Sequence, residues 1–185
     1  NVFKLKIRMS KLYVNSKELF RYSSELGKLV TKDYKPDAII GLSRGGNTPS
    51  IIIHELLNYN GINCKYFNMS CKSYNQDNSQ SDECIVNCSQ DTLNSLQECS
   101  DILIVDDVFD TGITTNNILN YLSMHHILSY NIKIATIFYK PSNNKTTITP
   151  NYYIITTSDW IVFPHEYIGL TDFEISQKVN HENNS

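Results

Sequence analysis

The sequence predicts an α/β fold with a mainly parallel central sheet flanked by helices. Short strand-like segments alternate with segments of helical periodicity through the middle of the chain, as in strands joined by crossover helices. Polar or charged clusters directly follow three of the strand-like segments, at 43–46, 106–107 and 140–141. Because the carboxyl ends of parallel strands meet at one edge of a sheet, we expect a ligand to bind there.

Six short segments read as strands, and the apolar run at 101–105 is the strongest of them. The predicted strands span 38–42, 64–68, 83–87, 101–105, 132–139 and 152–155. The polar stretch 69–83 reads as a long loop, and long loops in compact domains are often lids.

Helical periodicity marks the connecting segments. Ser16 is a candidate N-cap for a first amphipathic helix, which ends before Pro36. Pro49 suits the first turn of a second helix that extends to about Leu57. Two further helices are predicted over 91–97 and 114–124.

Length and composition predict one domain of 185 residues. We expect a core over about 10–157, an irregular segment over about 158–170 and a frayed polar tail over about 178–185. The net charge of −3 provides no basic surface for nucleic acid or an anionic membrane. No apolar run approaches the roughly 18 residues of a membrane span, and no signal peptide is recognisable. We therefore expect a cytoplasmic protein whose five cysteines are reduced structural thiols, with a zinc site or a redox role as the alternatives.

The most informative stretch is an apolar run that leads into two aspartates, a turn and the start of a helix. Asp106 and Asp107 follow the strand, and the Thr-Gly-Ile-Thr-Thr segment 111–115 opens the helix. The N–H groups of a helix start, with threonine hydroxyls, form a cradle for phosphate. Adjacent carboxylates can bind the vicinal hydroxyls of a ribose or a Mg²⁺ ion. The stretch presents the groups that a ribose 5-phosphate requires, whereas a plain capped helix leaves two like charges uncompensated.

This stretch resembles the motif that binds phosphoribosyl pyrophosphate (PRPP) in type I phosphoribosyltransferases. That motif consists of an apolar strand, two acidic residues, two variable residues and a Thr-Gly-x-Thr loop. The resemblance covers residues 10–167 and implies the fold of that family, with a small hood formed by C-terminal and N-terminal segments. It implies that Asp106 and Asp107 contact the ribose hydroxyls and Mg²⁺. The residues that it places around the 5′-phosphate are Thr111, Gly112, Ile113, Thr114 and Thr115.

Asp110 narrows the resemblance to the 6-oxopurine members, the xanthine-guanine and hypoxanthine-guanine phosphoribosyltransferases, which carry an aspartate directly before Thr-Gly. The resemblance places this residue near N7 of the purine as a general base. The chemistry agrees, because the purine must lose a proton as N9 bonds to C1′. Taken alone, Asp110 also reads as an N-cap of the following helix.

Two loops extend the resemblance at the PRPP end. Ser43, Arg44 and Gly45 belong to a Ser-Arg-Gly-Gly segment that resembles the pyrophosphate loop, where a guanidinium and backbone N–H groups bind phosphate. Ser73 and Tyr74 resemble the Ser-Tyr pair of the flexible catalytic loop, which closes over PRPP and excludes water. A simple turn and an ordinary polar loop are the alternatives.

Lys140 and Trp160 resemble base-recognition residues. Lys140 follows a strand and would contact the purine O6, because an ammonium donates to an oxo group but cannot accept from an exocyclic amine. Trp160 and Ile161 lie in the segment of about 158–170, which resembles the base-binding hood, where an aromatic ring stacks on the purine. A solvated lysine and a packed tryptophan are the alternatives. His165 stands where the family often has tryptophan, which leaves the base preference open.

The resemblance implies Mg²⁺-dependent transfer of the 5-phosphoribosyl group of PRPP to N9 of guanine, hypoxanthine or xanthine, in purine salvage, by a homodimer or homotetramer. The alternatives are a non-catalytic PRPP-sensing module on the same fold and a phosphoribosyltransferase for another nucleobase. The catalytic-loop pair, Lys140 and Trp160 favour an enzyme, and Asp110 with Lys140 favours a 6-oxopurine. A flavodoxin-like nucleotide-binding protein leaves the paired aspartates unexplained.

Overall fold

The computed structural model describes residues 10–73, 84–127 and 131–183. Its helices are α1 (Ser16–Asp33), α2 (Asn47–Tyr59), α3 (Gln90–Gln97), α4 (Ile113–Met124) and α5 (Asp172–Asn183), with a short 3-10 helix, η1 (Pro141–Asn143). Its strands are β1 (Lys11–Tyr13), β2 (Ala38–Ser43), β3 (Lys65–Ser73), β4 (Cys84–Asn87), β5 (Asp101–Phe109), β6 (Asn131–Tyr139), β7 (Tyr152–Thr156) and β8 (Trp160–Val162). Residues 22–157 form one compact unit, and the two ends of the chain, up to residue 21 and from residue 158, form another.

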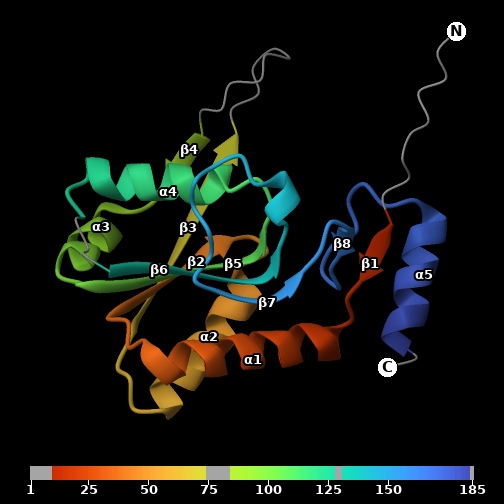
Figure 1. Cartoon of the computed structure of the whole chain (residues 1–185), viewed down its shortest axis with the longest axis horizontal. Coiled ribbons are helices and arrows are strands. Elements are labelled where there is room, and N and C mark those ends of the chain that lie inside the picture. The colour runs from red at the N-terminus through yellow and green to blue at the C-terminus, as the bar shows by residue number, and fades with distance from the viewer. Residues whose placement is uncertain (1–9, 74–83, 128–130, 184–185) are drawn as a thin grey trace, which may run out of the picture. The chain divides into compact units, whose positions relative to one another are not determined.

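The larger unit is built on a six-stranded sheet in the order β4-β3-β2-β5-β6-β7. Neighbouring strands in it are parallel except for β3 and β4. Helices cover both faces, with α3 and α4 on one and α1 and α2 on the other (Figure 1). The predicted α/β fold with a mainly parallel sheet is therefore confirmed.

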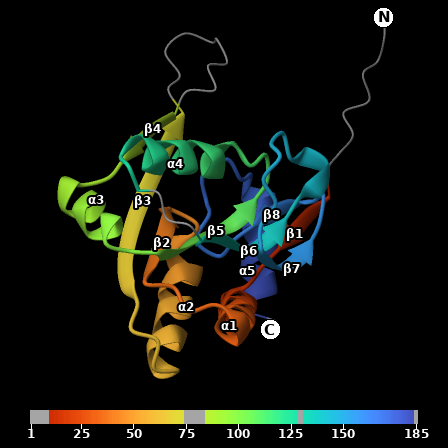
Figure 2. The same ribbon diagram turned by 60° about the vertical axis from the view of Figure 1, so that its left-hand side comes forward.

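Helices on both faces account for the uninterrupted apolar strands. Ile39 and Ile40 are neighbours in β2 whose side chains point to opposite faces, and neither has exposed surface. Figure 2 shows α4 alongside β3 and β4. On the other face α1 approaches α2 closely, because a Cβ atom at Gly27 would come within 2.7 Å of Leu56 Cδ1.

The strand order places a topological switch point between β2 and β5. From β2 the chain passes first to β3 on one side and later to β5 on the other. Ligands of open α/β sheets bind beyond the strand ends at such a point. β2 pairs with β5 only as far as Gly41 and Val105, whereas β5 continues along β6 to Phe109. Asp106 and Asp107 lie in this extension. They are therefore part of the strand, whereas the sequence predicted that they follow it.

Two local predictions differ from the structure. β3 extends to Ser73, because it pairs with antiparallel β4 over residues that read as a loop. Asn15, rather than Ser16, caps α1: its side-chain oxygen accepts from the Glu18 N–H at 2.7 Å, and the Glu18 carboxylate accepts from the Asn15 N–H at 3.0 Å. This reciprocal pair is a capping box.

The cysteines whose side chains the structure describes fall into two groups. Cys71 on β3 is disulfide-bonded, so the expectation that all five cysteines are reduced is wrong at this position. The free cysteines of the described chain are Cys64, Cys88 and Cys99. Burial raises the pKa of Cys64 to about 12, which disfavours its reactive thiolate form.

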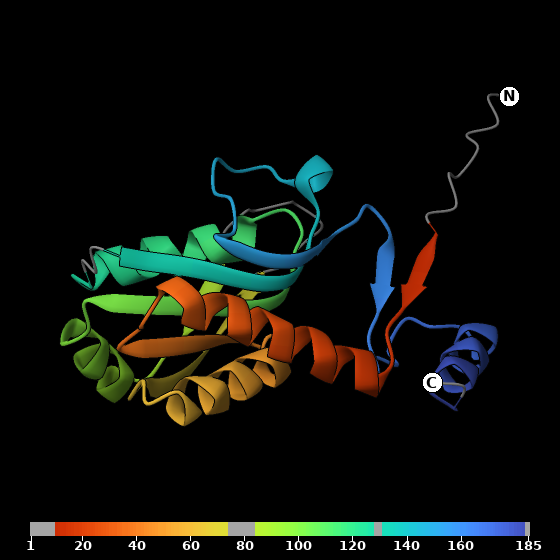
Figure 3. The ribbon, with the colours of Figure 1, turned by 60° about the horizontal axis from the view of Figure 1, so that its bottom comes forward.

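The smaller unit joins the two ends of the chain. Strand β1 pairs in parallel with β8 (Figure 3). In this register Lys11 lies opposite Trp160. The sequence did not lead us to predict this pairing or helix α5, and residues 178–183, expected to be frayed, form the last turns of α5. Among the described residues, no helix combines the length and apolar character that a membrane span needs.

Helix α5 is held by a second capping box and by two lysines. Thr171 Oγ1 accepts from the Glu174 N–H at 3.3 Å, and the Glu174 carboxylate accepts from the Thr171 N–H at 2.9 Å. Lys11 pairs with Glu174 at 2.6 Å, and the bonds from Lys11 and Thr171 lower the pKa of Glu174 to about 2. Lys178 is buried and donates to the Glu166 carbonyl oxygen at 2.6 Å.

Candidate active site

The two aspartates of β5 lie against the loop that follows β2. A Cβ atom at Gly45 would overlap the Asp107 carboxylate, so only glycine lets the loop come this close. Gly46 is also closely packed, since a Cβ atom there would come within 2.5 Å of the Val105 carbonyl oxygen. Two motifs that are distant in sequence thus form one surface at the switch point of the sheet.

Burial and the neighbouring negative charge disfavour the charged form of Asp106. Asp106 is partly buried, and its pKa is raised well above its usual value, first by burial and then by the negative charge of Asp107. The Asp107 N–H offsets part of this rise, because the Asp106 carboxylate accepts from it at 3.0 Å. The Asp107 carboxylate accepts from the Val108 N–H at 2.8 Å. A bound cation or diol would further stabilise these charges, so the pair is suited to such a ligand.

Two helices begin at this edge of the sheet with glycine as N-cap. Gly46 precedes α2 and Gly112 precedes α4, and neither helix has a side-chain cap hydrogen bond. Gly112 has a φ of 77° and packs against the side chains of Asn144 and Thr146. Because helix N-termini carry partial positive charge and direct N–H groups outward, both ends are suited to binding phosphate.

The predicted 5′-phosphate residues form the turn into α4. Thr111 Oγ1 accepts from the Ile113 N–H at 3.4 Å, which orders the turn. Thr114 is exposed at the helix start, whereas Thr115 is buried. The structure therefore brings the five predicted residues together, but Thr114 rather than Thr115 presents its side chain at the surface.

Ser43, at the end of β2, contacts two asparagines that the sequence analysis missed. Its hydroxyl donates to Asn68 and lies 3.3 Å from Asn47 Oδ1, and Asn68 Nδ2 donates to Asn47 Oδ1 at 2.5 Å. The Ser43–Arg44 peptide bond is cis, and the Arg44 side chain is exposed. The network joins β2, α2 and β3, and the Arg44 guanidinium lies at the surface where a phosphate could reach it.

Asp110 is held from both sides by the segment after β6. Lys140 Nζ donates to Asp110 Oδ2 at 3.2 Å, and Asn143 Nδ2 donates to Asp110 Oδ1 at 2.8 Å. The Lys140 side chain is 5% exposed and that of Asp110 is 42% exposed, so the carboxylate is open to a ligand while its cationic partner is buried. Asp110 and Lys140, predicted at separate strand ends, thus lie together, and Asn143 joins them.

The predicted catalytic loop lies largely outside the described residues. Ser73 ends strand β3. Its side chain, and Tyr74 with the residues up to 83, are not part of the described structure. The roles of Ser73 and Tyr74 stay predictions.

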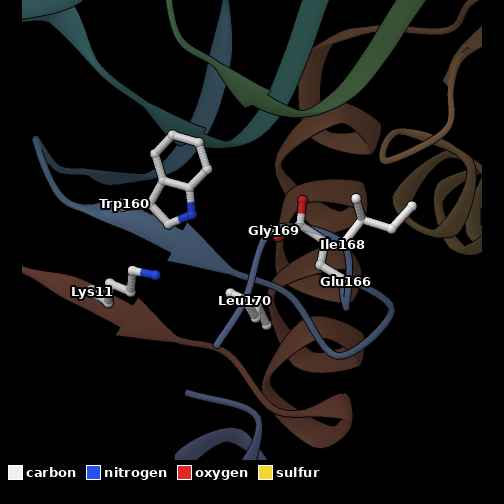
Figure 4. Close-up of a pocket in the computed structure, with 6 residues that line it drawn as sticks. All are labelled: Lys11, Trp160, Glu166, Ile168, Gly169 and Leu170. Carbon is white, nitrogen blue, oxygen red and sulfur yellow. The ribbon is translucent and has the colours of Figure 1, made fainter. Parts of the chain in front are cut away.

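Trp160 and Ile161 belong to β8 in the smaller unit and differ in burial. Trp160 is 53% exposed, and Ile161 is 6% exposed. A pocket of about 330 Å³ is lined by Lys11, Trp160, Glu166, Ile168, Gly169 and Leu170 (Figure 4). Small-molecule sites have volumes of this order, and an exposed indole is suited to stacking on a planar ring. His165, at the departure from the family pattern, stacks on the Phe163 ring with centroids 5.4 Å apart.

Magnesium is the cation that the family resemblance implies. Within the described ranges, no group of three or more histidine, cysteine, aspartate or glutamate side chains is placed to hold a metal. Mg²⁺ is commonly held by one or two carboxylates, with water and substrate phosphates as the other ligands. Asp106 and Asp107 offer oxygen ligands of that kind, so the donor chemistry fits a magnesium ion shared with a phosphorylated substrate.

Sequence comparisons relate the chain to known proteins. The phosphoribosyl transferase domain family matches residues 15–168. A hypoxanthine-guanine phosphoribosyltransferase of Lactococcus lactis subsp. lactis (strain IL1403) is 29% identical over 180 residues, which cover 95% of this chain and 87% of that protein. One from Streptococcus pyogenes serotype M3 (strain SSI-1) is 31% identical over 148 residues, which cover 78% of this chain and 77% of that protein.

A solved structure shares the fold. The purine phosphoribosyltransferase from Pyrococcus horikoshii Ot3 has a TM-score of 0.69 and 28% sequence identity, and the match covers 89% of this chain and 99% of that chain. The family match includes the β2–α2 loop, the acidic strand end and Trp160, whereas helix α5 lies beyond its end at residue 168.

Proposed function

The chain belongs to the phosphoribosyl transferase domain family, and from this premise we propose that it transfers the 5-phosphoribosyl group of PRPP to N9 of a 6-oxopurine. The products are a nucleoside 5′-monophosphate and pyrophosphate, which is the chemistry of purine salvage. The main supporting observation is the close approach of Gly45 to the Asp107 carboxylate at the switch point of the sheet. Relatives named hypoxanthine-guanine phosphoribosyltransferase support a 6-oxopurine as the acceptor.

PRPP would bind across the two loops at the switch point. The turn 111–115 would hold the 5′-phosphate, and Asp106 and Asp107 would accept hydrogen bonds from the ribose hydroxyls. The loop 43–46 would receive the pyrophosphate through backbone N–H groups and the exposed Arg44. Asp106 and Asp107 would hold a Mg²⁺ ion, which when bound would neutralise charge on the pyrophosphate.

The reaction is a displacement at C1′ of PRPP. The N9 lone pair forms the bond to C1′, and the bond from C1′ to the pyrophosphate oxygen breaks, with its electron pair leaving on pyrophosphate. The purine N7 proton passes to Asp110, so charge and atoms balance. The transition state has oxocarbenium character, as in other glycosyl transfers. Asp106 and Asp107 would stabilise positive charge on the ribose, and Arg44 would stabilise the leaving group.

The purine would be selected by its oxo group. The Lys140 ammonium would release the Asp110 carboxylate and donate its hydrogen bond to the purine O6 instead. An adenine would leave this buried ammonium facing an amino group, which is costly. Trp160 would stack on the purine and the Ile161 backbone would read its edge. Ser73 and Tyr74 would close over PRPP and exclude water.

The decisive experiment is pyrophosphate release from PRPP with Mg²⁺ and a panel of bases. We expect release with guanine, hypoxanthine or xanthine and none with adenine or uracil. Omission of Mg²⁺ with a chelator should abolish release. Binding of PRPP in calorimetry without turnover of any base would refute the enzyme and leave a PRPP-sensing module.

A further inference from the structure

The two oxygens of the Asp110 carboxylate have chemically different partners. Oδ1 accepts from the neutral amide of Asn143 at 2.8 Å, and Oδ2 accepts from the ammonium of Lys140 at 3.2 Å. Both donors follow β6 within four residues of each other. The amide can serve the carboxylate alone, whereas the ammonium has a second acceptor in the proposed reaction, the purine O6.

We propose that Asn143 is a positioning residue for Asp110. Its hydrogen bond keeps Asp110 Oδ1 in place while the Lys140 ammonium moves from Asp110 Oδ2 to the purine O6. This inference rests on the proposed function. O6 and N7 are adjacent on one edge of a 6-oxopurine. A lysine that turns to O6 therefore leaves Oδ2 facing N7, where it accepts the proton. The carboxylate must not follow the lysine as it turns, and Asn143 provides the bond that holds it.

Backbone hydrogen bonds hold the donor rigidly. The Lys140 N–H donates to the Phe109 carbonyl oxygen at 2.9 Å, and the Asn143 N–H donates to the Lys140 carbonyl oxygen at 3.1 Å. On the far side of η1, the Lys145 N–H donates to the Thr111 carbonyl oxygen at 2.9 Å. The turn that bears Asn143 is thus bound to the residues on both sides of Asp110, so the amide and the carboxylate keep a fixed geometry.

Side chains within the same loop add to this support. The Asn144 Oδ1 atom accepts from the Thr146 N–H and hydroxyl, both at 2.9 Å, and Asn144 Nδ2 donates to the Ile148 carbonyl oxygen at 2.8 Å. These bonds belong to the loop and do not reach Asp110. A substitution at Asn143 therefore removes the contact to the carboxylate while this second network remains.

The test compares variants of the 185-residue chain with Mg²⁺, a base that the parent chain uses, and PRPP varied from below its KM to saturation. Asn143→Ala should lower kcat about 10- to 100-fold, the range for one hydrogen bond to a charged acceptor, with KM for PRPP changed less than about twofold. Asn143→Asp keeps the shape of the side chain but removes the donor and adds repulsion, so it should lower kcat at least as much. Ser142→Ala, on the same turn, is the control and should stay within about twofold of the parent.

A double-mutant cycle separates positioning from a structural role. In an Asp110→Ala background, Asn143→Ala should have almost no further effect on kcat, because the group through which it acts is gone. A full-sized loss in that background, or parental kcat in both Asn143 variants, would overturn the proposal. If Asn143→Ala does not fold, the shape-conserving Asn143→Asp variant decides between the same outcomes. A parent chain inactive with every base refutes the proposed function instead, so the two failures are distinguishable.

Discussion

The helices that border the candidate site begin differently from the two helices whose N-termini lie in the smaller unit. Helices α2 and α4 start at glycine with no side-chain cap, whereas α1 and α5 each start with a reciprocal capping box. A side-chain cap is worth about 1 kcal/mol. Helices α2 and α4 therefore lack a common source of helix stability, which α1 and α5 both have.

Close packing explains why the site helices lack caps. A Cβ atom at Gly46 would meet two carbonyl oxygens, and Gly112 has the positive φ that glycine adopts most readily. The N–H groups at both helix starts can then face a phosphate instead of a side chain. We therefore expect site substitutions to act mainly on catalysis and capping-box substitutions to act mainly on stability.

The largest expected effect is on turnover at the site. Asp110→Asn removes the proposed general base, so kcat should fall by about 10²- to 10⁴-fold. PRPP affinity should change much less, because the acidic pair and the phosphate turn are untouched. Steady-state kinetics and calorimetric titration with PRPP measure the two quantities separately. Equal kcat in variant and parent would exclude Asp110 from proton transfer.

The next effect concerns the closest contact between the two PRPP motifs. Gly45→Ala places a methyl group on the Asp107 carboxylate, so one of them must move. We expect KM for PRPP to rise about 10- to 100-fold, the penalty for misplacing binding groups by about 1 Å. Gly61→Ala is a matched control: it strains a φ of 76° but meets no neighbouring atom, so KM should not change. Similar KM values in both variants would contradict the assigned contact.

Substitution of Asp106 tests whether this carboxylate destabilises the unliganded fold while it contributes to PRPP binding. Asp106→Asn should weaken PRPP binding and yet stabilise the unliganded chain by about 1 kcal/mol, or about 2–4 °C in Tm. The raised pKa sets the pH dependence. Below the ordinary pKa of 3.8 both folded and unfolded parent are protonated, and the gain is absent. As pH rises, the unfolded parent ionises first, so the gain grows until the pH exceeds the raised folded-state pKa.

Denaturant unfolding from pH 3 to pH 8 measures this gain. The Asp101→Asn variant, at the opposite end of β5, serves as the comparison. A variant that is less stable than the parent at neutral pH would show that Asp106 supports the fold rather than straining it.

The smallest effect is expected in the smaller unit. Thr171→Ala removes the capping bond to the Glu174 N–H and should lower stability by about 1 kcal/mol. Thr171 belongs to the smaller unit and the acidic pair of β5 to the larger one, so we expect kcat to be unchanged. Thermal unfolding and the same kinetic assay measure both. A large drop in kcat with unchanged Tm would contradict the division of roles between the two regions.

Local sequence patterns were enough to predict much of the secondary structure and the position of the candidate site. The apolar runs predicted the strands of the central sheet, and the acidic strand end with its Thr-Gly-x-Thr turn predicted where the site lies. These features depend on neighbours in the chain, so spacing alone reveals them. Helix α5 was missed, although the Thr171-x-x-Glu174 spacing is a capping-box signal that could have revealed it.

Only the tertiary structure decided the contacts between distant residues. Lys11 and Trp160 pair at the two ends of the chain, and Asn143 meets Asp110 across thirty-three positions of sequence. An asparagine in a turn has many possible partners, and no local spacing selects one. The sequence thus determines which groups stand at the end of each strand, and packing of the sheet and its helices determines which of those groups are close enough to bond.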